Sequence, residues 1–92
     1  MNKEAIVDLI KGEFTPDEAT EILFSIIGDK IRFNNRQIFS LEVRNIGNPE
    51  KYKTRLEELK VSKEIVSKLI QNAKKDNCMI EINSTILIKI NQ

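Results

Sequence analysis

The feature that most constrains the fold is the regular spacing of isoleucine in the stretch CMIEINSTILIKINQ. Alternate residues of a β-strand point to the same side of a sheet, so this spacing predicts a strand with one apolar face. A strand cannot stand alone, because its backbone N–H and C=O groups need partners. The chain must therefore supply a second strand or pair with another molecule. The residues that share the predicted face are Ile80, Ile82, Ser84, Ile86, Ile88 and Ile90.

A tight hairpin that turns at Asn83-Ser84 is the competing interpretation of this stretch. A two-residue turn there would pair Ile80 with Leu87 and would divide the isoleucines between the core and water. Such a division is disfavoured, because a sheet with one buried face specifies its register strongly. The sequence therefore predicts one long strand that is buried along one face.

Two helices are indicated by their start signals. In FTPDEATEIL, Thr15 suits the N-cap, Pro16 suits the first helical position, and Glu18 completes a capping box. Apolar residues then recur at helical spacing as far as Ile31. The sequence predicts an amphipathic helix over this stretch.

Beyond Ile31 the helical pattern degrades, because polar residues fall on the apolar side if the helix continues. Buried lysine and asparagine side chains need partners, so the end of a helix is the commoner explanation. We expect the helix to end near Asn34-Asn35 and a loop to follow before Asn48. The polar residues are Lys30, Asn34 and Gln37, and the apolar residues expected to pack from the loop onto the core are Phe39 and Leu41.

The second helix is expected to begin at Asn48, which suits the cap, with Pro49 in the first turn. It carries one main apolar stripe and a second stripe displaced around the helix axis. The apolar surface therefore widens toward the end of the helix, as if this half contacts two neighbours. The main stripe is Tyr52, Leu56, Leu59, Val66, Ile70 and Ala73, and the displaced stripe is Val61, Ile65 and Leu69.

The other strand candidate is AIVDLIKGEF near the N-terminus. It could also form a short helix between Asn2 and Gly12. We interpret residues 5–11 as a strand, partly because the isoleucine-rich strand needs a neighbour. The sequence then predicts one α+β domain over residues 1–92, with the order strand–helix–helix–strand. In it, an antiparallel helix hairpin packs on one face of a small antiparallel sheet.

A two-stranded sheet is marginal in water and has two open edges. We expect a second copy to extend the sheet as an isologous homodimer, or a protein partner to add a strand there. The alternative is a monomer whose edges are blunted by Lys3, Glu4, Lys11 and Lys89. The candidate partner or dimer surface comprises Val61, Ile65, Leu69, Ile86, Ile88 and Ile90.

Four segments, LIKGEFTPDEATEIL, KIRFNN, KTRLEELK and EINSTILIKI, resemble a family of small uncharacterised bacterial proteins of about this length. The resemblance implies a strand that runs directly into a helix, and so supports the strand near the N-terminus. The phenylalanine of KIRFNN is often followed by histidine in that family, whereas this chain has Asn34. The resemblance implies no activity, substrate or partner.

Catalytic and metal-binding chemistry has little support in the sequence. The chain has no histidine and one cysteine, so the commonest general base and metal ligand are absent, and Cys78 has no histidine to activate it. The glycines form no phosphate-binding motif. We expect no enzymatic activity, no cofactor and no metal, and we interpret Cys78 as a small apolar residue.

The charge distribution suggests an alternative function. Residues 1–29 carry a net charge of −5 and residues 30–60 a net charge of +4. Arginine beside aromatic and amide side chains can bind nucleic acid, and this alternative rests on Lys30, Arg32, Arg36 and Arg44. A single cysteine and the lack of a long apolar run lead us to expect a cytoplasmic protein that does not enter a membrane.

Overall fold

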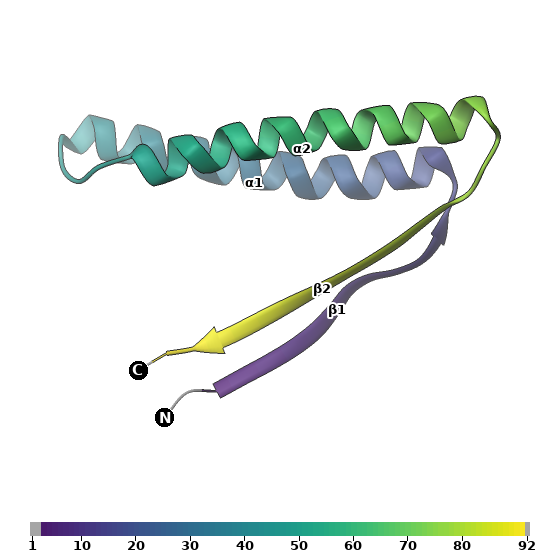
Figure 1. Cartoon of the computed structure of the whole chain (residues 1–92). Helices are drawn as coiled ribbons and strands as arrows, with labels where there is room; N and C mark the ends of the chain where they lie inside the picture. The colour runs from purple at the N-terminus through teal and green to yellow at the C-terminus, as the bar shows by residue number, and fades with distance from the viewer. Residues whose placement is uncertain (1–2, 92) are drawn as a thin grey trace.

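The computed structural model describes residues 3–91 as two long strands that flank two long helices (Figure 1). The order is β1 (Lys3–Phe14), α1 (Pro16–Arg44), α2 (Glu50–Lys75) and β2 (Ile80–Ile90). The two strands pair antiparallel, and the two helices run side by side. The predicted fold class is confirmed, as are the strand near the N-terminus and the single long strand in place of a hairpin at Asn83-Ser84.

The junction between β1 and α1 is as sharp as its start signal predicts. Thr15 alone separates the two elements, and its side-chain Oγ1 accepts a hydrogen bond from the backbone N–H of Glu18 at 3.1 Å. In return, the Glu18 carboxylate accepts a hydrogen bond from the backbone N–H of Thr15 at 2.9 Å. Both halves of the capping box are therefore present, and they fix the point at which the chain turns from strand to helix.

The predicted end of α1 near Asn34-Asn35 is wrong, because the helix continues to Arg44. Asn34 is buried, at 5% exposure, and its Nδ2 donates a hydrogen bond to the backbone oxygen of Lys30 at 2.8 Å. An amide satisfied by its own helix needs no partner across the core, so it does not interrupt the helix. The helix ends instead at Asn45, which adopts the left-handed conformation with φ 53°.

The predicted loop is correspondingly short, since only residues 45–49 separate the helices. Phe39, which was expected to pack from a loop onto the core, lies on α1 and is 69% exposed, whereas Leu41 is half-buried. The predicted cap at Asn48 is wrong by one residue, because Pro49 is the N-cap; the Asn48 Oδ1 instead accepts a hydrogen bond from the N–H of Glu50 at 2.9 Å, just before the helix. The helix itself begins after Pro49.

The main apolar contact of the molecule is the seam between the two helices. Phe33 and Tyr52 meet edge to face, with ring centroids 6.5 Å apart. The Nζ of Lys63 lies 5.8 Å from the centroid of the Phe24 ring. The most deeply buried apolar residues among those described are Ala19, Leu59 and Ile70. The core is therefore thin, as expected for a chain of this length.

The sheet has a defined register with one interruption among the described residues. Phe14 lies opposite Ile80, and Val7 lies opposite Ile86. A β-bulge between Asp8 and Ile10 leaves Leu9 as an extra residue in β1. Because of this extra residue, the β1 residues on the isoleucine face have odd numbers before the bulge and even numbers after it.

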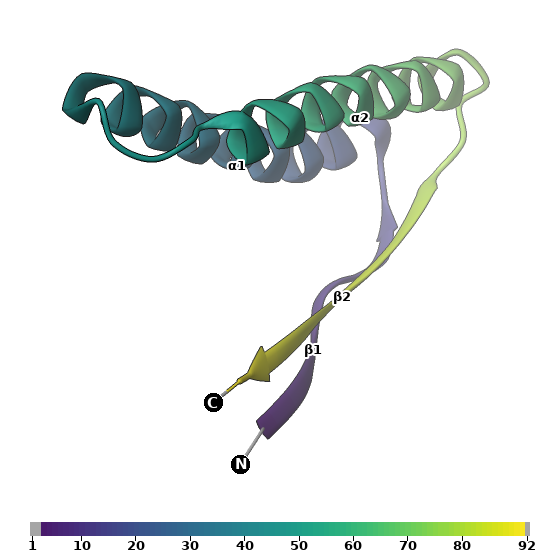
Figure 2. The ribbon, with the colours of Figure 1, turned by 60° about the vertical axis from the view of Figure 1, so that its left-hand side comes forward.

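The strand pair leaves one end of the helix hairpin and diverges from it, so the molecule is open (Figures 1 and 2). The radius of gyration is 16.6 Å, whereas a compact domain of this length has about 12 Å. The accessible surface is 7320 Å², whereas a compact monomer of 10.6 kDa exposes about 5,500 Å². One chain therefore leaves uncovered a large area that a compact fold would bury.

Candidate interaction surface

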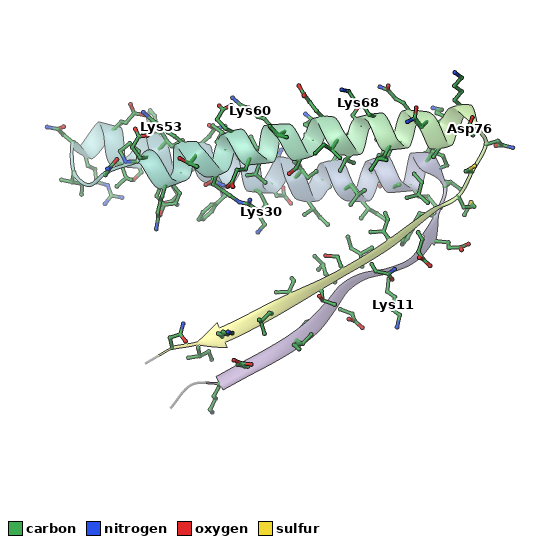
Figure 3. The ribbon with its side chains drawn as sticks, viewed as in Figure 1. Lys11, Lys30, Lys53, Lys60, Lys68 and Asp76 are labelled. Carbon is green, nitrogen blue, oxygen red and sulfur yellow. The ribbon has the colours of Figure 1, made fainter. Side chains whose placement is uncertain are left out.

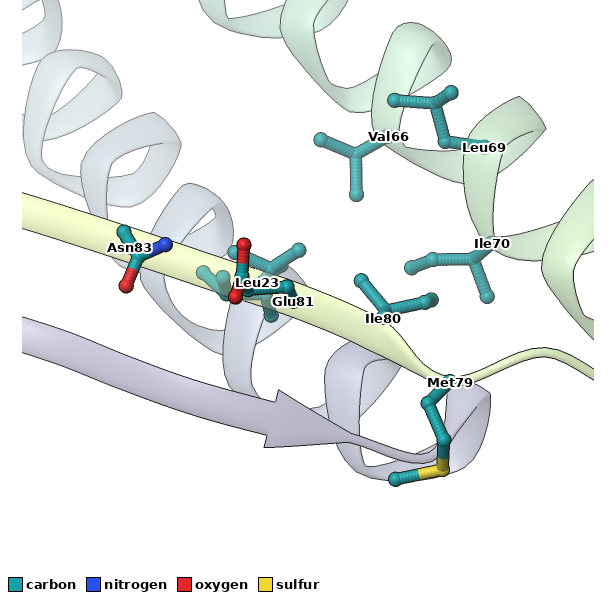
Figure 4. Close-up of a pocket in the computed structure, with 9 residues that line it drawn as sticks. Leu23, Val66, Leu69, Ile70, Met79, Ile80, Glu81 and Asn83 are labelled. Atoms are coloured by element: carbon teal, nitrogen blue, oxygen red, sulfur yellow. The ribbon is translucent and has the colours of Figure 1, made fainter.

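The half of the sheet nearest the helices is covered by them. We call the residues of the isoleucine face in this region the near half: Ile10, Gly12, Phe14, Ile80 and Ile82. All five are partly buried. Leu23 of α1 and Val66 and Ile70 of α2 lie over Ile80 and Ile82, and together they line a cleft of about 430 Å³ (Figure 4).

The cleft also reaches the outer edge of β2. Glu81 and Asn83 line it, although their side chains belong to the opposite face of the sheet from Ile80 and Ile82. All the strand residues that line the cleft belong to β2 and none belongs to β1, so the cleft lies on the side of β2 that is not paired with β1. Leu69 and Met79 form its exposed rim, at 62% and 55% exposure.

The rest of the isoleucine face is bare. Lys3 lies opposite Ile90 on this face, and we call the apolar residues beside it the far half: Ala5, Val7, Ile86, Ile88 and Ile90. All five are exposed; Ile88 is 47% exposed and Ile90 is 55% exposed. The prediction that the strand is buried along one face is therefore confirmed for the near half alone. It fails in the far half because the helices diverge from the sheet (Figure 2).

The displaced stripe of α2, which is Val61, Ile65 and Leu69, is also exposed. Leu69 adjoins the cleft beside β2, and the other two residues continue the stripe along the helix toward its N-terminus. A second neighbour for this half of α2 was expected from the sequence. Among residues 3–91 no segment covers the stripe.

The opposite face of the sheet has a different character. Along it, Lys89 lies next to Glu4 of the paired strand, with the lysine Nζ 3.7 Å from the carboxylate Oε1. Glu13 lies directly opposite Glu81, which places two like charges across the strand pair. Its one large apolar pair is Ile6 opposite Leu87, and both residues are exposed. The charges mark this as the face that meets water.

The basic residues of the alternative function do not form a single patch. Lys30, Arg32, Arg36 and Arg44 are all exposed. Arg32 and Arg36 lie one turn apart on α1, but Lys30 lies about 160° around the helix from Arg32. The Arg32 guanidinium is paired with the carboxylate of Asp29, and Arg44 donates a hydrogen bond to the Ser40 Oγ at 2.8 Å. Figure 3 shows Lys30 on the side of the helix pair that faces the strands.

Within residues 3–91 no cluster of histidine, cysteine or acidic side chains is arranged to hold a metal ion. Cys78 is exposed, and its Sγ donates a weak hydrogen bond to the backbone oxygen of Asp76 at 3.5 Å. Neither α1 nor α2 contains a stretch that is both long enough and apolar enough to span a bilayer.

No family model matches the chain, and no curated protein or solved structure is significantly similar to it. The structure has the strand running directly into a helix that the resemblance to small bacterial proteins implies, within a strand–helix–helix–strand layout.

Sequence reasoning identified Ile86, Ile88 and Ile90 but missed Ala5 and Val7 of the far half. The signal that would have found them is the alternation in β1. The bulge at Leu9 changes that alternation, so no single parity runs through the strand.

Proposed function

We propose that this chain is a small, non-enzymatic interaction protein whose first partner is a second copy of itself. The observation that carries the proposal is the exposed area, which exceeds that of a compact chain of this mass by about 1,800 Å². A stable protein–protein interface buries about 800 Å² from each partner. The area that one chain leaves bare is therefore sufficient for a specific interface. We place the protein in the cytoplasm, since a lone cysteine is typical of reducing compartments.

The position of the bare area supports the same function. The far half and the α2 stripe are both exposed and apolar, and exposed apolar patches on a small protein are typical of interaction sites. All the charged residues of the two strands except Lys3 lie on the opposite face, at Glu4, Asp8, Lys11, Glu13, Glu81 and Lys89. The far half of the isoleucine face thus has the apolar residues typical of a core, but no described segment of the same chain packs on it.

Two neighbouring residues of β2 provide the test. Ile88 and Leu87 are both exposed apolar residues, but only Ile88 belongs to the far half. Sedimentation equilibrium of the wild type should give a dimer. The change Ile88→Lys should raise its dissociation constant at least ~100-fold, because an unpaired charge buried in an interface costs about 3 kcal/mol or more. Leu87→Lys is the matched control and should leave the dissociation constant within about 3-fold of wild type.

Two results would count against self-association. The first is a wild-type chain that stays monomeric at every concentration measured. The second is an equal effect of Ile88→Lys and Leu87→Lys on the dissociation constant. Circular dichroism of both variants guards against loss of folding, which is not expected because both side chains are exposed in the single chain.

Nucleic-acid binding is the second candidate function. It is supported by the continuation of α1 to Arg44, which places Arg32 and Arg36 one turn apart and exposed. The pairing of Arg32 with Asp29 and the net charge of +1 weaken it. Binding to DNA or RNA should fall steeply as salt rises and should be lost in the double variant Arg32→Ala, Arg36→Ala. Absence of binding at low salt would exclude this function.

A further inference from the structure

We infer that two copies join through the outer edges of their β2 strands, in an antiparallel pairing centred on Thr85. The result is a continuous four-stranded sheet with β1 on each outer side and the two β2 strands in the middle. The inference rests on the proposed self-association and adds to it the edge that pairs and the register of the pairing.

The choice of β2 follows from the regularity of the two edges. β1 contains the bulge at Leu9 and five charged residues, which are Lys3, Glu4, Asp8, Lys11 and Glu13. Bulges and charges on an edge strand oppose pairing with another strand. β2 is eleven residues long, keeps its alternation throughout and carries two charged residues, Glu81 and Lys89. The regular edge is therefore that of β2.

The register follows from the faces of the strand. Residues directly opposite each other in an antiparallel pair point to the same side of the sheet, so the isoleucines of the two copies share a face only when even-numbered residues meet even-numbered residues. Centring the pair on Thr85 aligns all eleven residues of both strands. Ile80 then lies opposite Ile90 of the second copy, and Ile82 opposite Ile88 of the second copy.

Charge selects this register over its neighbours. With Thr85 at the centre, Glu81 lies opposite Lys89 of the second copy, and symmetry repeats the pair. Moving the centre by one residue in either direction keeps the isoleucines on one face but separates both charged pairs. Within one chain Glu81 faces Glu13, which is unfavourable for like charges, with Lys11 as the diagonal neighbour. The second copy's lysine would bring an opposite charge directly beside Glu81.

The same pairing covers the bare apolar surface. A strand added along the outer edge of β2 enters the side on which the cleft opens, beside Leu69 and Met79. In this register the residues brought there are Ile88 and Ile90 of the second copy, which belong to its far half. The α2 stripe of each chain then overhangs the far half of the other. Each chain supplies the cover that the other lacks.

Disulfide trapping tests the register directly. Residues directly opposite in an antiparallel pair have Cα atoms about 4.5–5.5 Å apart, which a disulfide can bridge. In a Cys78→Ser background, Thr85→Cys should therefore form a covalent dimer with oxidised glutathione. Asn83→Cys and Leu87→Cys are the controls, since each would lie about 13 Å along the strand from its own copy. Thr85→Cys should react at least ~10-fold faster than either control. Equal rates, faster controls or no covalent dimer would overturn the register.

Charge exchange separates the register from self-association itself. Glu81→Lys and Lys89→Glu should each weaken the homodimer roughly 10-fold, because each places like charges opposite one another. A mixture of the two variants restores both opposite-charge pairs, so it should form heterodimers with a dissociation constant within about 3-fold of wild type. Wild-type dimers that neither change affects would overturn the register and leave self-association standing. A monomeric wild type would overturn both.

Discussion

The near and far halves of the isoleucine face have the same spacing and much the same residues, yet they differ completely in their surroundings. Ile80 and Ile82 lie partly buried beneath Leu23, Val66 and Ile70. Ile88 and Ile90, further along the same strand, are exposed. The difference shows that alternation alone does not determine whether the chain itself covers a face. The chain's own helices cover the near half, and we propose that a second copy covers the far half.

The largest difference in unfolding free energy is expected between two isoleucine-to-alanine variants, one at a residue that covers the near half and one in the far half. Ile70, which covers the near half, is 7% exposed, so Ile70→Ala should lower the free energy of unfolding by about 2–4 kcal/mol. Ile88→Ala, in the far half, should cost less than about 1 kcal/mol at concentrations where the protein is monomeric. Urea denaturation at low protein concentration measures both values.

The same two variants also test whether the far half is bare in a single chain and covered by a second copy. If Ile88→Ala costs as much as Ile70→Ala in the dilute monomer, the far half is covered within one chain. Raising the protein concentration should increase the cost of Ile88→Ala, because dimerisation stabilises the folded state by mass action. A cost that does not change with concentration would contradict cover by a second copy.

A smaller effect is expected at the α2 stripe. The double variant Val61→Gln, Ile65→Gln should weaken dimerisation by about 2 kcal/mol, or roughly 30-fold, because it removes apolar area from the proposed contact. The unfolding free energy of the monomer should change little, since both residues are exposed in the single chain. Analytical ultracentrifugation provides the dissociation constant. An unchanged dissociation constant would remove the stripe from the interface and leave the β2 edge alone.

The smallest effect is expected at the junction that holds the near half in place. Thr15→Ala removes one half of the capping box and should lower the free energy of unfolding by about 1 kcal/mol. The dissociation constant should change little, since Thr15 follows β1, and β2 separates β1 from the edge at which the second copy is proposed to pair. Thr15→Ser, which keeps the hydroxyl, is the control and should lose much less. Thermal denaturation followed by circular dichroism measures both.

The parts of the fold that depend on local signals could be predicted from the sequence. The capping box at Thr15, the alternation of β2 and the order of the elements are all determined by neighbouring residues. The end of α1 could not be predicted, because Asn34 looks like a polar interruption until its hydrogen bond to the Lys30 carbonyl is seen. The bulge at Leu9 could not be predicted either, because it is defined only by the pairing of β1 with β2.

The candidate surface was predicted in part for a related reason. The exposed positions Val61, Ile65 and Leu69 follow from helical spacing, which is local. The division of β2 into covered and bare halves depends on the angle at which the sheet leaves the helices, which involves residues far apart in the sequence. The alternation of apolar and polar residues along a strand carries no information about the angle between the sheet and the helices.

The most direct test of cover by a second copy is a measurement of contacts between copies. Isotope-filtered nuclear Overhauser spectroscopy on a mixture of labelled and unlabelled chains detects protons that approach across an interface. We expect contacts from the methyl groups of Ile88 and Ile90 in one copy to Ile82 and Leu69 in the other. A dimer whose intermolecular contacts avoid these residues, or a monomer at millimolar concentration, would contradict cover by a second copy.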